Sequence, residues 1–250
     1  MRIILTGYAG HMGREVRACA EAAENCEIAA GVDPMIPAPE GVCVKSFAEC
    51  TADADVIIDF SHHSMTNDLL DFAEARKLPV VLATTGQTEE EKKRIREAAK
   101  RIPIFMAANY SLGIAALTDL VKRAAALYPD GEIEIVEQHH DRKLDAPSGT
   151  ALALFNAVKE ARPSAEANCG RNGMGKRTKD EVGIHAVRMG NIVGIHEVMI
   201  GTQNERITLK HEAFSRGVFA EGSLKAAAFL AGRAPGMYDM KDLLKEGNGA

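Results

Sequence analysis

The sequence predicts an α/β protein with an N-terminal, Rossmann-like, doubly wound parallel sheet and a following α+β domain. Two observations predict this fold class. Short apolar runs alternate with helical patterns from Arg2 to Ala107, and a glycine-rich loop directly follows the first run. Beyond about residue 112, longer β-rich segments lie between short Gly/Asn turns. We therefore expect a nucleotide domain first and a substrate domain after it.

In the first half, each predicted strand is a compact apolar run, and each predicted helix carries apolar side chains three or four residues apart. Strands are expected at Arg2–Thr6, Glu27–Val32, Asp55–Asp59, Pro79–Ala83 and Pro103–Ala107, and helices at His11–Glu24, Thr66–Arg76 and Glu89–Lys100. Strands that alternate with helices of this length indicate βαβ units, and hence a parallel sheet.

The second half opens with a predicted helix, Ile114–Leu127, a half-exposed strand, Glu132–His139, and another helix, Gly149–Glu160. Ser164–Gly183 is rich in glycine and charge without periodicity, and we expect a mobile loop there. Three segments separated by short turns predict an antiparallel meander, and an apolar helix follows. The segments are Ile184–Met189, Ile192–Ile200 and Glu205–His211, and the helix is Val218–Gly232.

Composition argues against several classes of function. The chain has 250 residues and a net charge of −5, which gives no electrostatic surface for nucleic acid. No apolar run approaches the roughly 20 residues of a membrane helix, and the apolar stretch after Arg2 is too short for a signal peptide. Five cysteines without a C-x-x-C pair indicate reduced thiols. We expect a soluble cytoplasmic protein without a metal site.

The loop after the first strand reads Gly7-Tyr8-Ala9-Gly10-His11-Met12-Gly13 and opens a helix. Glycine is needed where a turn is tight or where backbone approaches a pyrophosphate, and a helix N-terminus offers N–H groups to phosphates. Asp33 ends the second strand, where an acid would bind the adenosine ribose. No arginine follows Asp33 within ten residues, which favours NADH over NADPH, although His11 or Lys45 could add positive charge.

The most specific stretch is EQHHDRKLDAPSGT, which lies between the end of a strand and the start of a helix. Histidine exchanges protons near neutral pH, and lysine supplies a cation or a proton. Hydroxyl and N–H groups at a helix start can cap the helix or bind a carboxylate. Together these groups suit a small dicarboxylate. They are His139, His140, Lys143, Ser148, Gly149 and Thr150.

Taken alone, each part also has an ordinary structural explanation. Paired histidines on a half-exposed strand are often polar surface, and S-G-T before an apolar helix is often only an N-cap. Behind a predicted dinucleotide fold, the catalytic interpretation is favoured. A second histidine pair, in Asp59-Phe60-Ser61-His62-His63, follows a buried strand, and a cofactor contact and a polar loop fit it equally well.

The motifs of this chain resemble those of the 4-hydroxy-tetrahydrodipicolinate reductase (dihydrodipicolinate reductase) family. Glu137–Ala151 resembles that family's signature E-x-H-H-x-x-K-x-D-A-P-S-G-T-A. Further segments resemble the family in the same order, so the resemblance covers essentially the whole chain. These segments are Gly7–Gly13, Ala83–Gly86, Ala107–Ser111, Val187–His196 and Gly236–Met240.

The resemblance implies an NAD(P)H-dependent reduction of 4-hydroxy-tetrahydrodipicolinate to tetrahydrodipicolinate with loss of water, in lysine and diaminopimelate biosynthesis. It implies acid–base work at His139, proton donation by Lys143, and binding of substrate carboxylates by His140, Ser148, Gly149 and Thr150. The implied cofactor contacts are Gly7, Tyr8, Ala9, Gly10, His11, Met12, Asp33, Ala83, Thr84, Thr85, Ala107, Ala108, Asn109 and Tyr110.

The resemblance also implies a domain arrangement and an assembly. A dinucleotide-binding domain would be formed by 1–111 and 217–250, on both sides in the sequence of a substrate-binding and oligomerisation domain at 112–216. The sheets of this second domain would build a homotetramer. Ala9 and His11 stand where many members of the family carry glycine and arginine, and the second departure weakens the case for NADPH.

Two other classes of function stay open. One is another two-domain NAD(P)-dependent dehydrogenase, of the amino-acid or homoserine type, and the other is a non-catalytic NAD-binding regulator. Fold alone does not separate the first from a reductase, but the histidine–lysine motif favours the reductase. The intact proton-donor set argues against a regulator.

Overall fold

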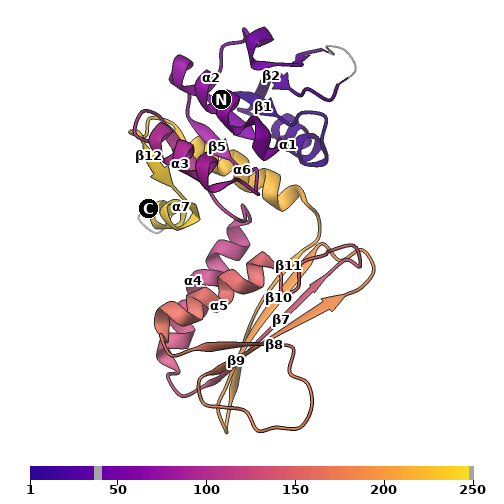
Figure 1. The fold of residues 1–250 in the computed structure, drawn as a ribbon, viewed down its shortest axis with the longest axis vertical. Coiled ribbons are helices and arrows are strands. Elements are labelled where there is room, and N and C mark those ends of the chain that lie inside the picture. Colours follow the sequence, from indigo (N-terminus) through magenta and orange to yellow (C-terminus); the bar gives the residue numbers. More distant parts are fainter. Residues whose placement is uncertain (37–40, 248–250) are drawn as a thin grey trace. The chain divides into compact units, whose positions relative to one another are not determined.

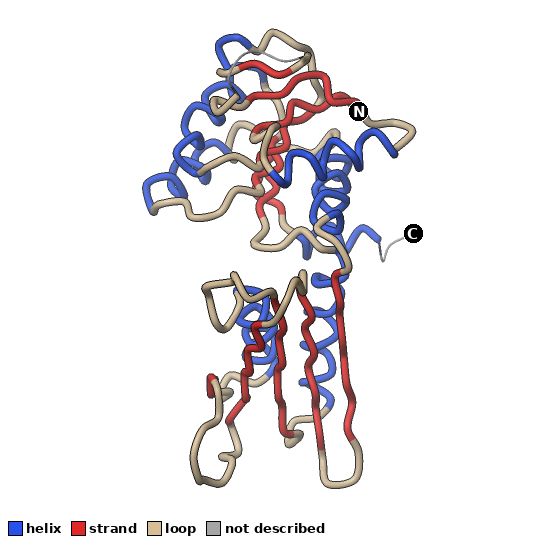
Figure 2. Tube along the Cα trace, turned by 90° about the vertical axis from the view of Figure 1, so that its right-hand side faces the viewer, coloured by secondary structure: helices blue, strands red, loops and turns tan. Residues whose placement is uncertain are grey.

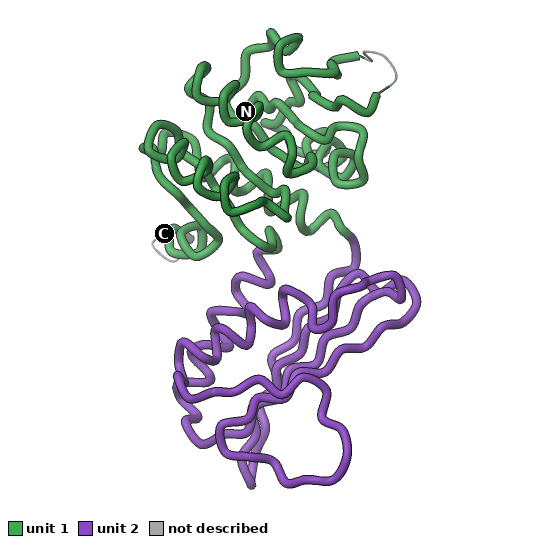
Figure 3. Tube along the Cα trace, viewed as in Figure 1, with its two compact units in different colours: residues 1–111, 216–250 green, residues 112–215 purple. Residues whose placement is uncertain are grey.

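The computed structural model describes residues 1–36 and 41–247. The chain divides into two compact units, each with its own sheet (Figure 3). Unit 1 comprises Met1–Ser111 and Arg216–Ala250, and unit 2 comprises Leu112–Ser215. Unit 2 is therefore an insertion in the chain of unit 1.

Unit 1 contains a seven-stranded parallel sheet with the order β12-β6-β5-β4-β1-β2-β3. The strand order reverses between β1 and β4, and ligands of open α/β sheets bind outside the carboxyl ends of the strands at such a point. The predicted doubly wound sheet is confirmed. Its strands are β1 (Arg2–Thr6), β2 (Glu27–Val32), β3 (Cys43–Val44), β4 (Val56–Asp59), β5 (Val80–Leu82), β6 (Pro103–Met106) and β12 (Gly236–Tyr238).

Helices pack on both faces of this sheet, with α2 against α3 and α1 against α6. Ile4 and Ile57 pack with Leu69 of α2 and Ile95 of α3. Neighbouring strand residues such as Ile3 point to the other face and are equally buried, which explains why the strands are continuous apolar runs. The helices are α1 (His11–Ala22), α2 (Thr66–Arg76), α3 (Glu89–Ala98), α6 (Gly217–Leu230) and α7 (Met240–Gly247), and the 3₁₀ turns are η1 (Phe47–Glu49) and η2 (His63–Met65).

Helix α6 returns the chain to unit 1 and packs on α1, β4, β5 and β6. Gly222 makes this packing possible, because a Cβ there would lie 1.7 Å from the carbonyl oxygen of Tyr110. β12 then pairs with β6, with Met237 opposite Ile104. The helix was expected from the sequence, whereas β12 and α7 were not.

Unit 2 contains a five-stranded sheet with the order β11-β10-β7-β9-β8. Helices α4 (Leu112–Leu127) and α5 (Gly149–Ala161) contact each other and lie together on one face of this sheet (Figures 1 and 2). Ile133 and Ile135 of β7 are buried there with Val121 of α4 and Leu154 of α5. The strands are β7 (Glu132–His139), β8 (Glu166–Cys169), β9 (Glu181–Arg188), β10 (Gly194–Gly201) and β11 (Arg206–Ala213).

The predicted antiparallel meander is wrong. β10 and β11 form an antiparallel hairpin, but β9 pairs in parallel with β7, and β7 lies between β9 and β10. The connection from β9 to β10 crosses the end of β7, where the amide of His140 donates to Ile192 O (2.8 Å) and that of Met189 donates to His139 O (2.9 Å). The residues of the turn between β9 and β10 are typical of a hairpin, which is why the sequence suggested one. They carry no information about a third strand that lies between the two arms.

The expectation of a loop over Ser164–Gly183 is wrong in part. β8 and the start of β9 lie in this stretch and pair in parallel. Between them, Arg177 donates to Ile133 O (2.9 Å) and forms an ion pair with Glu134, so the connection is attached to the sheet. β8 was missed because it is a short, mostly exposed edge strand without apolar alternation.

Across residues 1–36 and 41–247, the structure contains no helix with the length and apolar character needed to cross a membrane. Over the same residues, it places no three His, Cys, Asp or Glu side chains together as a metal site.

Candidate active site

The candidate catalytic residues of unit 2 lie where one face of β7 changes from apolar to polar. Side chains alternate along a strand, so Glu137 and His139 share the face of Ile133 and Ile135. The two isoleucines fill the core under α4 and α5. Beyond the core, the backbone N–H of Ser148 donates to Glu137 (3.0 Å), which brings the strand end and the start of α5 into contact.

Glu137 is the buried centre of this group. Its Oε2 accepts from Arg188 Nη1 (2.8 Å) and lies 2.5 Å from His139 Nδ1, and its Oε1 accepts from Arg188 Nη2 (2.7 Å) and from the Ser148 amide. Burial alone raises the pKa of Glu137, but the hydrogen bonds from Arg188, His139 and Ser148 outweigh burial and hold that pKa below its ordinary value. Glu137 is therefore a carboxylate at neutral pH.

His139 is nearly buried, and its ring is held from two sides. Nδ1 contacts Glu137, and the ring packs edge-on against His196 with the centroids 5.1 Å apart. Burial lowers the pKa of His139, and the neighbouring Glu137 carboxylate offsets this only in part. The neutral imidazole is therefore the resting form near pH 7, ready to exchange a proton.

The segment after β7 carries His140 and Lys143, the two other predicted side chains. Lys143 Nζ lies 2.8 Å from Asp145 Oδ1. Hydrogen bonds from the Lys143 side chain and from the backbone of Gly149 hold the pKa of Asp145 below its ordinary value. The Nδ1 of His140 is buried and has no hydrogen-bond partner among the described residues, so this atom is available to a ligand.

Ser148 caps α5 by accepting from the amide of Ala151 (3.2 Å), and its Oγ lies 3.2 Å from His196 Nε2. Burial lowers the pKa of His196 to about 4, so this ring is neutral. Its Nδ1 is buried without a partner among the described residues, which favours the tautomer with the proton on Nε2, because orphaned buried donors are rare. The Ser148 hydroxyl then accepts two hydrogen bonds and keeps its own proton for a ligand.

Gly149 and Thr150 are the first two residues of α5. The N-terminal end of a helix attracts anions through its unpaired N–H groups and its dipole. The structure thus brings all six predicted groups of unit 2 to the end of β7 and the start of α5.

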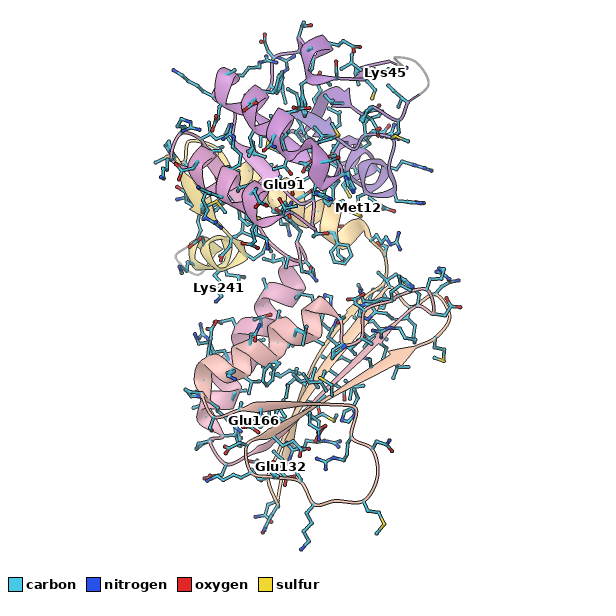
Figure 4. The ribbon with its side chains drawn as sticks, in the orientation of Figure 1. Met12, Lys45, Glu91, Glu132, Glu166 and Lys241 are labelled. Carbon is cyan, nitrogen blue, oxygen red and sulfur yellow. The ribbon has the colours of Figure 1, made fainter. Side chains whose placement is uncertain are left out.

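The predicted phosphate loop of unit 1 joins β1 to α1 at the carboxyl end of the sheet. Gly7 has φ +73°, and a Cβ there would lie 2.3 Å from Phe60 O, whereas a Cβ on Gly13 would lie 2.2 Å from Gly7 O. Both positions therefore require glycine. Gly10 caps α1 without a side-chain hydrogen bond, so the N–H groups of the first turn, which contains Met12 (Figure 4), are left for a ligand.

Asp33 lies buried just after β2 and holds this loop in place. Its Oδ2 accepts from the amide of Ala9 (2.9 Å), and its Oδ1 accepts from the amide of Met35 (2.9 Å). Each oxygen keeps a second lone pair, which a ribose hydroxyl can use. The guanidinium of Arg17 stacks over the ring of Tyr8, 4.2 Å from its centroid.

The segments after β5 and β6 complete the carboxyl edge. Thr84 Oγ1 is buried without a hydrogen-bond partner in the described part of the chain, so it is a candidate cofactor contact. Tyr110 differs, because its hydroxyl donates to Leu82 O (2.9 Å) in the core and burial raises its pKa well above the ordinary value. Only the backbone of Tyr110 is left for a cofactor. Ala83, Thr85, Ala107, Ala108 and Asn109 lie in the same two segments.

The second histidine pair makes local contacts that belong to the fold. His63 Nδ1 lies 3.1 Å from Glu91, which closes the capping box of α3 with Thr88 (Figure 4). His62 Nδ1 lies 2.9 Å from Ser64 Oγ. These contacts connect the end of β4 to α3 and favour the polar-loop interpretation.

Arg188 and His196 belong to this group of side chains, but no role was predicted for either. Arg188 reaches Glu137 because β9 pairs with β7 in parallel, and His196 lies directly opposite Glu137 on β10. Alternation along a strand indicates a face but not a register, so sequence alone does not bring these residues together. The only signal was that both lie in the Val187–His196 run.

A parallel sheet of this order, with a glycine-rich loop beside its switch point and a helix start without a side-chain cap, defines a dinucleotide-binding protein, and the histidine–lysine group adds side chains that can transfer protons. Two family models cover nearly the whole chain. "Dihydrodipicolinate reductase, N-terminus" matches residues 1–110, and "Dihydrodipicolinate reductase, C-terminus" matches residues 113–244. The chain belongs to the dihydrodipicolinate reductase family.

Individual relatives agree with this assignment. The chain is 47% identical over 249 residues to the 4-hydroxy-tetrahydrodipicolinate reductase of Caldanaerobacter subterraneus subsp. tengcongensis, which covers 99% of each chain. The reductase of the same name from Clostridium novyi is 42% identical over 250 residues, again 99% of each. The structure of dipicolinate-bound dihydrodipicolinate reductase from Paenisporosarcina sp. TG-14 has a TM-score of 0.80 at 25% identity, covering 96% of this chain and 97% of that one. The resemblance of the motifs is thereby confirmed.

Proposed function

We propose that this protein uses NADH or NADPH to reduce 4-hydroxy-tetrahydrodipicolinate to tetrahydrodipicolinate, with loss of water, in lysine and diaminopimelate biosynthesis. The observation that carries the proposal is the folded motif of unit 2, where His139, Lys143 and the start of α5 come together. The curated relatives are named for this activity, and each aligns with this chain over nearly its whole length. The solved relative with bound dipicolinate supports a small dicarboxylate as substrate.

The carboxyl edge of unit 1 fits a nicotinamide dinucleotide. The start of α1, which lacks a side-chain cap, suits the pyrophosphate, and the Asp33 carboxylate suits the ribose. The Thr84 hydroxyl, which has no hydrogen-bond partner among the described residues, offers a further contact. When bound, the cofactor would supply a hydride to the ring carbon that carried the hydroxyl before water was lost. The residues that would hold it are Gly7, Tyr8, Ala9, Gly10, His11, Met12, Asp33, Ala83, Thr84, Thr85, Ala107, Ala108, Asn109 and Tyr110.

The end of β7 and the start of α5 would bind and protonate the substrate. Ser148, Gly149 and Thr150 would bind a carboxylate through hydroxyl and backbone N–H groups, with His140 beside them. Lys143 would supply the proton needed as the hydroxyl leaves as water, and its charge would stabilise developing negative charge. Neutral His139 would exchange protons with the substrate.

We infer that NADH is preferred over NADPH. The buried Asp33 carboxylate lies beside the loop, and its charge would repel a phosphate on the ribose 2′-oxygen. Comparing kcat/KM for the two cofactors tests this. A clearly higher value with NADPH would contradict it.

The function is tested by coupling the purified protein to the synthase that forms the substrate from pyruvate and aspartate semialdehyde, while NADH absorbance is followed. Rapid oxidation that requires the complete mixture is expected. Replacing Lys143 by Ala should lower kcat by about 10² to 10⁴, the usual contribution of a general acid, and leave NADH binding nearly unchanged. Cofactor binding without oxidation by the wild-type protein would exclude this substrate.

We also infer a homotetramer in the cytoplasm. In unit 2, the described helices lie on one face of the sheet, so the opposite face is available to other copies. Light scattering coupled to size exclusion should give four times the mass of one chain, and a monomeric mass would overturn this assembly.

A further inference from the structure

We propose that Glu137 is a positioning residue, whose carboxylate keeps the ring proton of His139 on Nδ1 and leaves Nε2 as the atom that exchanges protons. This inference rests on the proposed function, because it specifies how the acid–base group of that site is oriented. The anchor of the carboxylate is Arg188 of the neighbouring strand.

Glu137 does not bind substrate itself, because its hydrogen-bonding capacity is already used. It is fully buried, and a carboxylate offers about four lone-pair positions. Arg188 occupies two of them, the Ser148 amide one and His139 one. The carboxylate therefore acts only through the groups that it holds.

The contact with His139 determines the tautomer. A carboxylate is only an acceptor, so the nitrogen 2.5 Å from Glu137 Oε2 has to carry the hydrogen. In the neutral ring the hydrogen is then on Nδ1, and Nε2 presents a lone pair. A ring bound in this way also cannot flip without losing a buried charge-assisted hydrogen bond.

The other edge of the ring is kept clear by Gly194. A Cβ on residue 194 would lie 3.2 Å from His139 Nε2, which is tight enough to press on this atom. The absence of a side chain at this position leaves room beside the nitrogen that the tautomer makes reactive.

Among the residues that the structure describes, four ionisable groups face His139 from the elements around it. Glu137 lies on β7, Arg188 on β9, His196 on β10, and Lys143 on the segment after β7. Glu137 alone among them carries negative charge, and it raises the pKa of His139 against burial, Lys143 and Arg188. Removing that charge should lower the pKa of His139 further.

The tautomer can be measured without substrate. In ¹⁵N NMR spectra of the wild-type protein above about pH 8, we expect His139 to show a protonated Nδ1 and an unprotonated Nε2. The reverse pattern would overturn the proposal, whatever the enzyme's activity. This readout separates the inference from the proposed function, which fails instead if the wild-type protein does not turn over the coupled substrate.

The variant Glu137→Gln should lower kcat by about 10- to 100-fold, a part of the usual contribution of acid–base catalysis, without changing KM for NADH. The limb of the kcat–pH profile that belongs to His139 should move to lower pH, and Glu137→Asp, which keeps the charge, should move it back. An unchanged kcat and pH profile in Glu137→Gln would overturn the proposal.

Two further variants guard against misfolding as the explanation. Gly194→Ala leaves Glu137 and Arg188 in place and should lower kcat while the ¹⁵N pattern of Nδ1 stays as in the wild type. Glu134→Gln is the matched control, because Glu134 lies on the opposite face of β7 and contacts another histidine, His185 (2.8 Å), and Arg177. Its pH profile should not change. If Glu134→Gln lowered kcat as much as Glu137→Gln does, any change of charge on β7 would have this effect, and the proposal would be overturned.

Discussion

Among single residues, Asp145 is notable because its carboxylate contacts the candidate site when no substrate is bound. Its carboxylate accepts hydrogen bonds from the ammonium of Lys143 and the backbone of Gly149, two of the groups proposed for the substrate. A carboxylate of the chain thus already contacts Gly149, a group proposed to bind a substrate carboxylate, and Lys143, the proposed proton donor. Substrate binding would require Asp145 to release Lys143.

We expect the variant Asp145→Asn to lower KM for the substrate. The Asp145 side chain is 56% exposed, and ion pairs this exposed contribute at most about 1 kcal/mol, which corresponds to a decrease of up to about fivefold. The measurement is steady-state kinetics at saturating NADH. Asp141→Asn, which removes an exposed partner of Arg142 instead, should leave KM unchanged, and a higher KM in Asp145→Asn would show that Asp145 assists binding.

Among the elements, α6 gives the clearest case of a packing constraint. In an exposed helix, replacing glycine by alanine stabilises by about 1 kcal/mol. At Gly222 the added Cβ would lie 1.7 Å from a backbone oxygen, so α6 would have to move away from Tyr110. We expect Gly222→Ala to lower the free energy of unfolding by about 1–3 kcal/mol, the usual cost of overpacking.

Urea unfolding measures this cost, and the neighbouring Glu221→Ala, at an exposed position of the same helix, should change stability little. Stabilisation of Gly222→Ala would mean that helix propensity outweighs packing and that α6 sits less closely on unit 1.

The sequence predicted most elements because their signals are local. Apolar runs and helical spacing located β1, β4 and α2, and the strand–loop–helix pattern predicted the phosphate loop. The pairing of β7 with β9 was not predictable, because the turn between β9 and β10 is consistent with a hairpin and β8 has too few buried residues to give a pattern. Pairing partners depend on packing between distant segments, which local chemistry does not contain.

The same distinction applies to the site. His139, Lys143 and Ser148 lie in one continuous motif and were predicted as a group. Arg188 and His196 come from two other strands, and only the register of the sheet brings them beside Glu137. A continuous motif can therefore indicate candidate reacting groups, but the residues that hold them in place can be recognised only in the folded sheet.

For the whole molecule, the buried histidines of unit 2 should make stability depend on pH. Burial lowers the pKa of His196 to about 4 in the fold, against 6.5 for an exposed histidine. The unfolded chain therefore binds a proton first as pH falls. The contribution of His196 to the free energy of unfolding is therefore fully present above about pH 6.5, and it is lost progressively between that pH and about 4. Each unit of difference in pKa corresponds to about 1.4 kcal/mol.

We expect the free energy of unfolding to fall between about pH 6.5 and 4.5, and to fall less steeply in His196→Gln. Urea unfolding at several pH values measures both slopes. His62→Gln, at an exposed histidine, should keep the wild-type slope. Equal slopes in wild type and His196→Gln would show that His196 is protonated as readily in the fold as in the unfolded chain.

The insertion of unit 2 has a mechanical consequence. Both β1 and α7 belong to unit 1, so the chain enters unit 2 from that unit and returns to it. When β1 and α7 are pulled apart, tension runs through the seven-stranded sheet and bypasses the inserted unit for as long as that sheet resists. Rupture should therefore follow a set order, with unit 1 opening first and unit 2 bearing load only afterwards. The unit that carries the residues proposed for proton transfer is therefore the unit that bears no load at first.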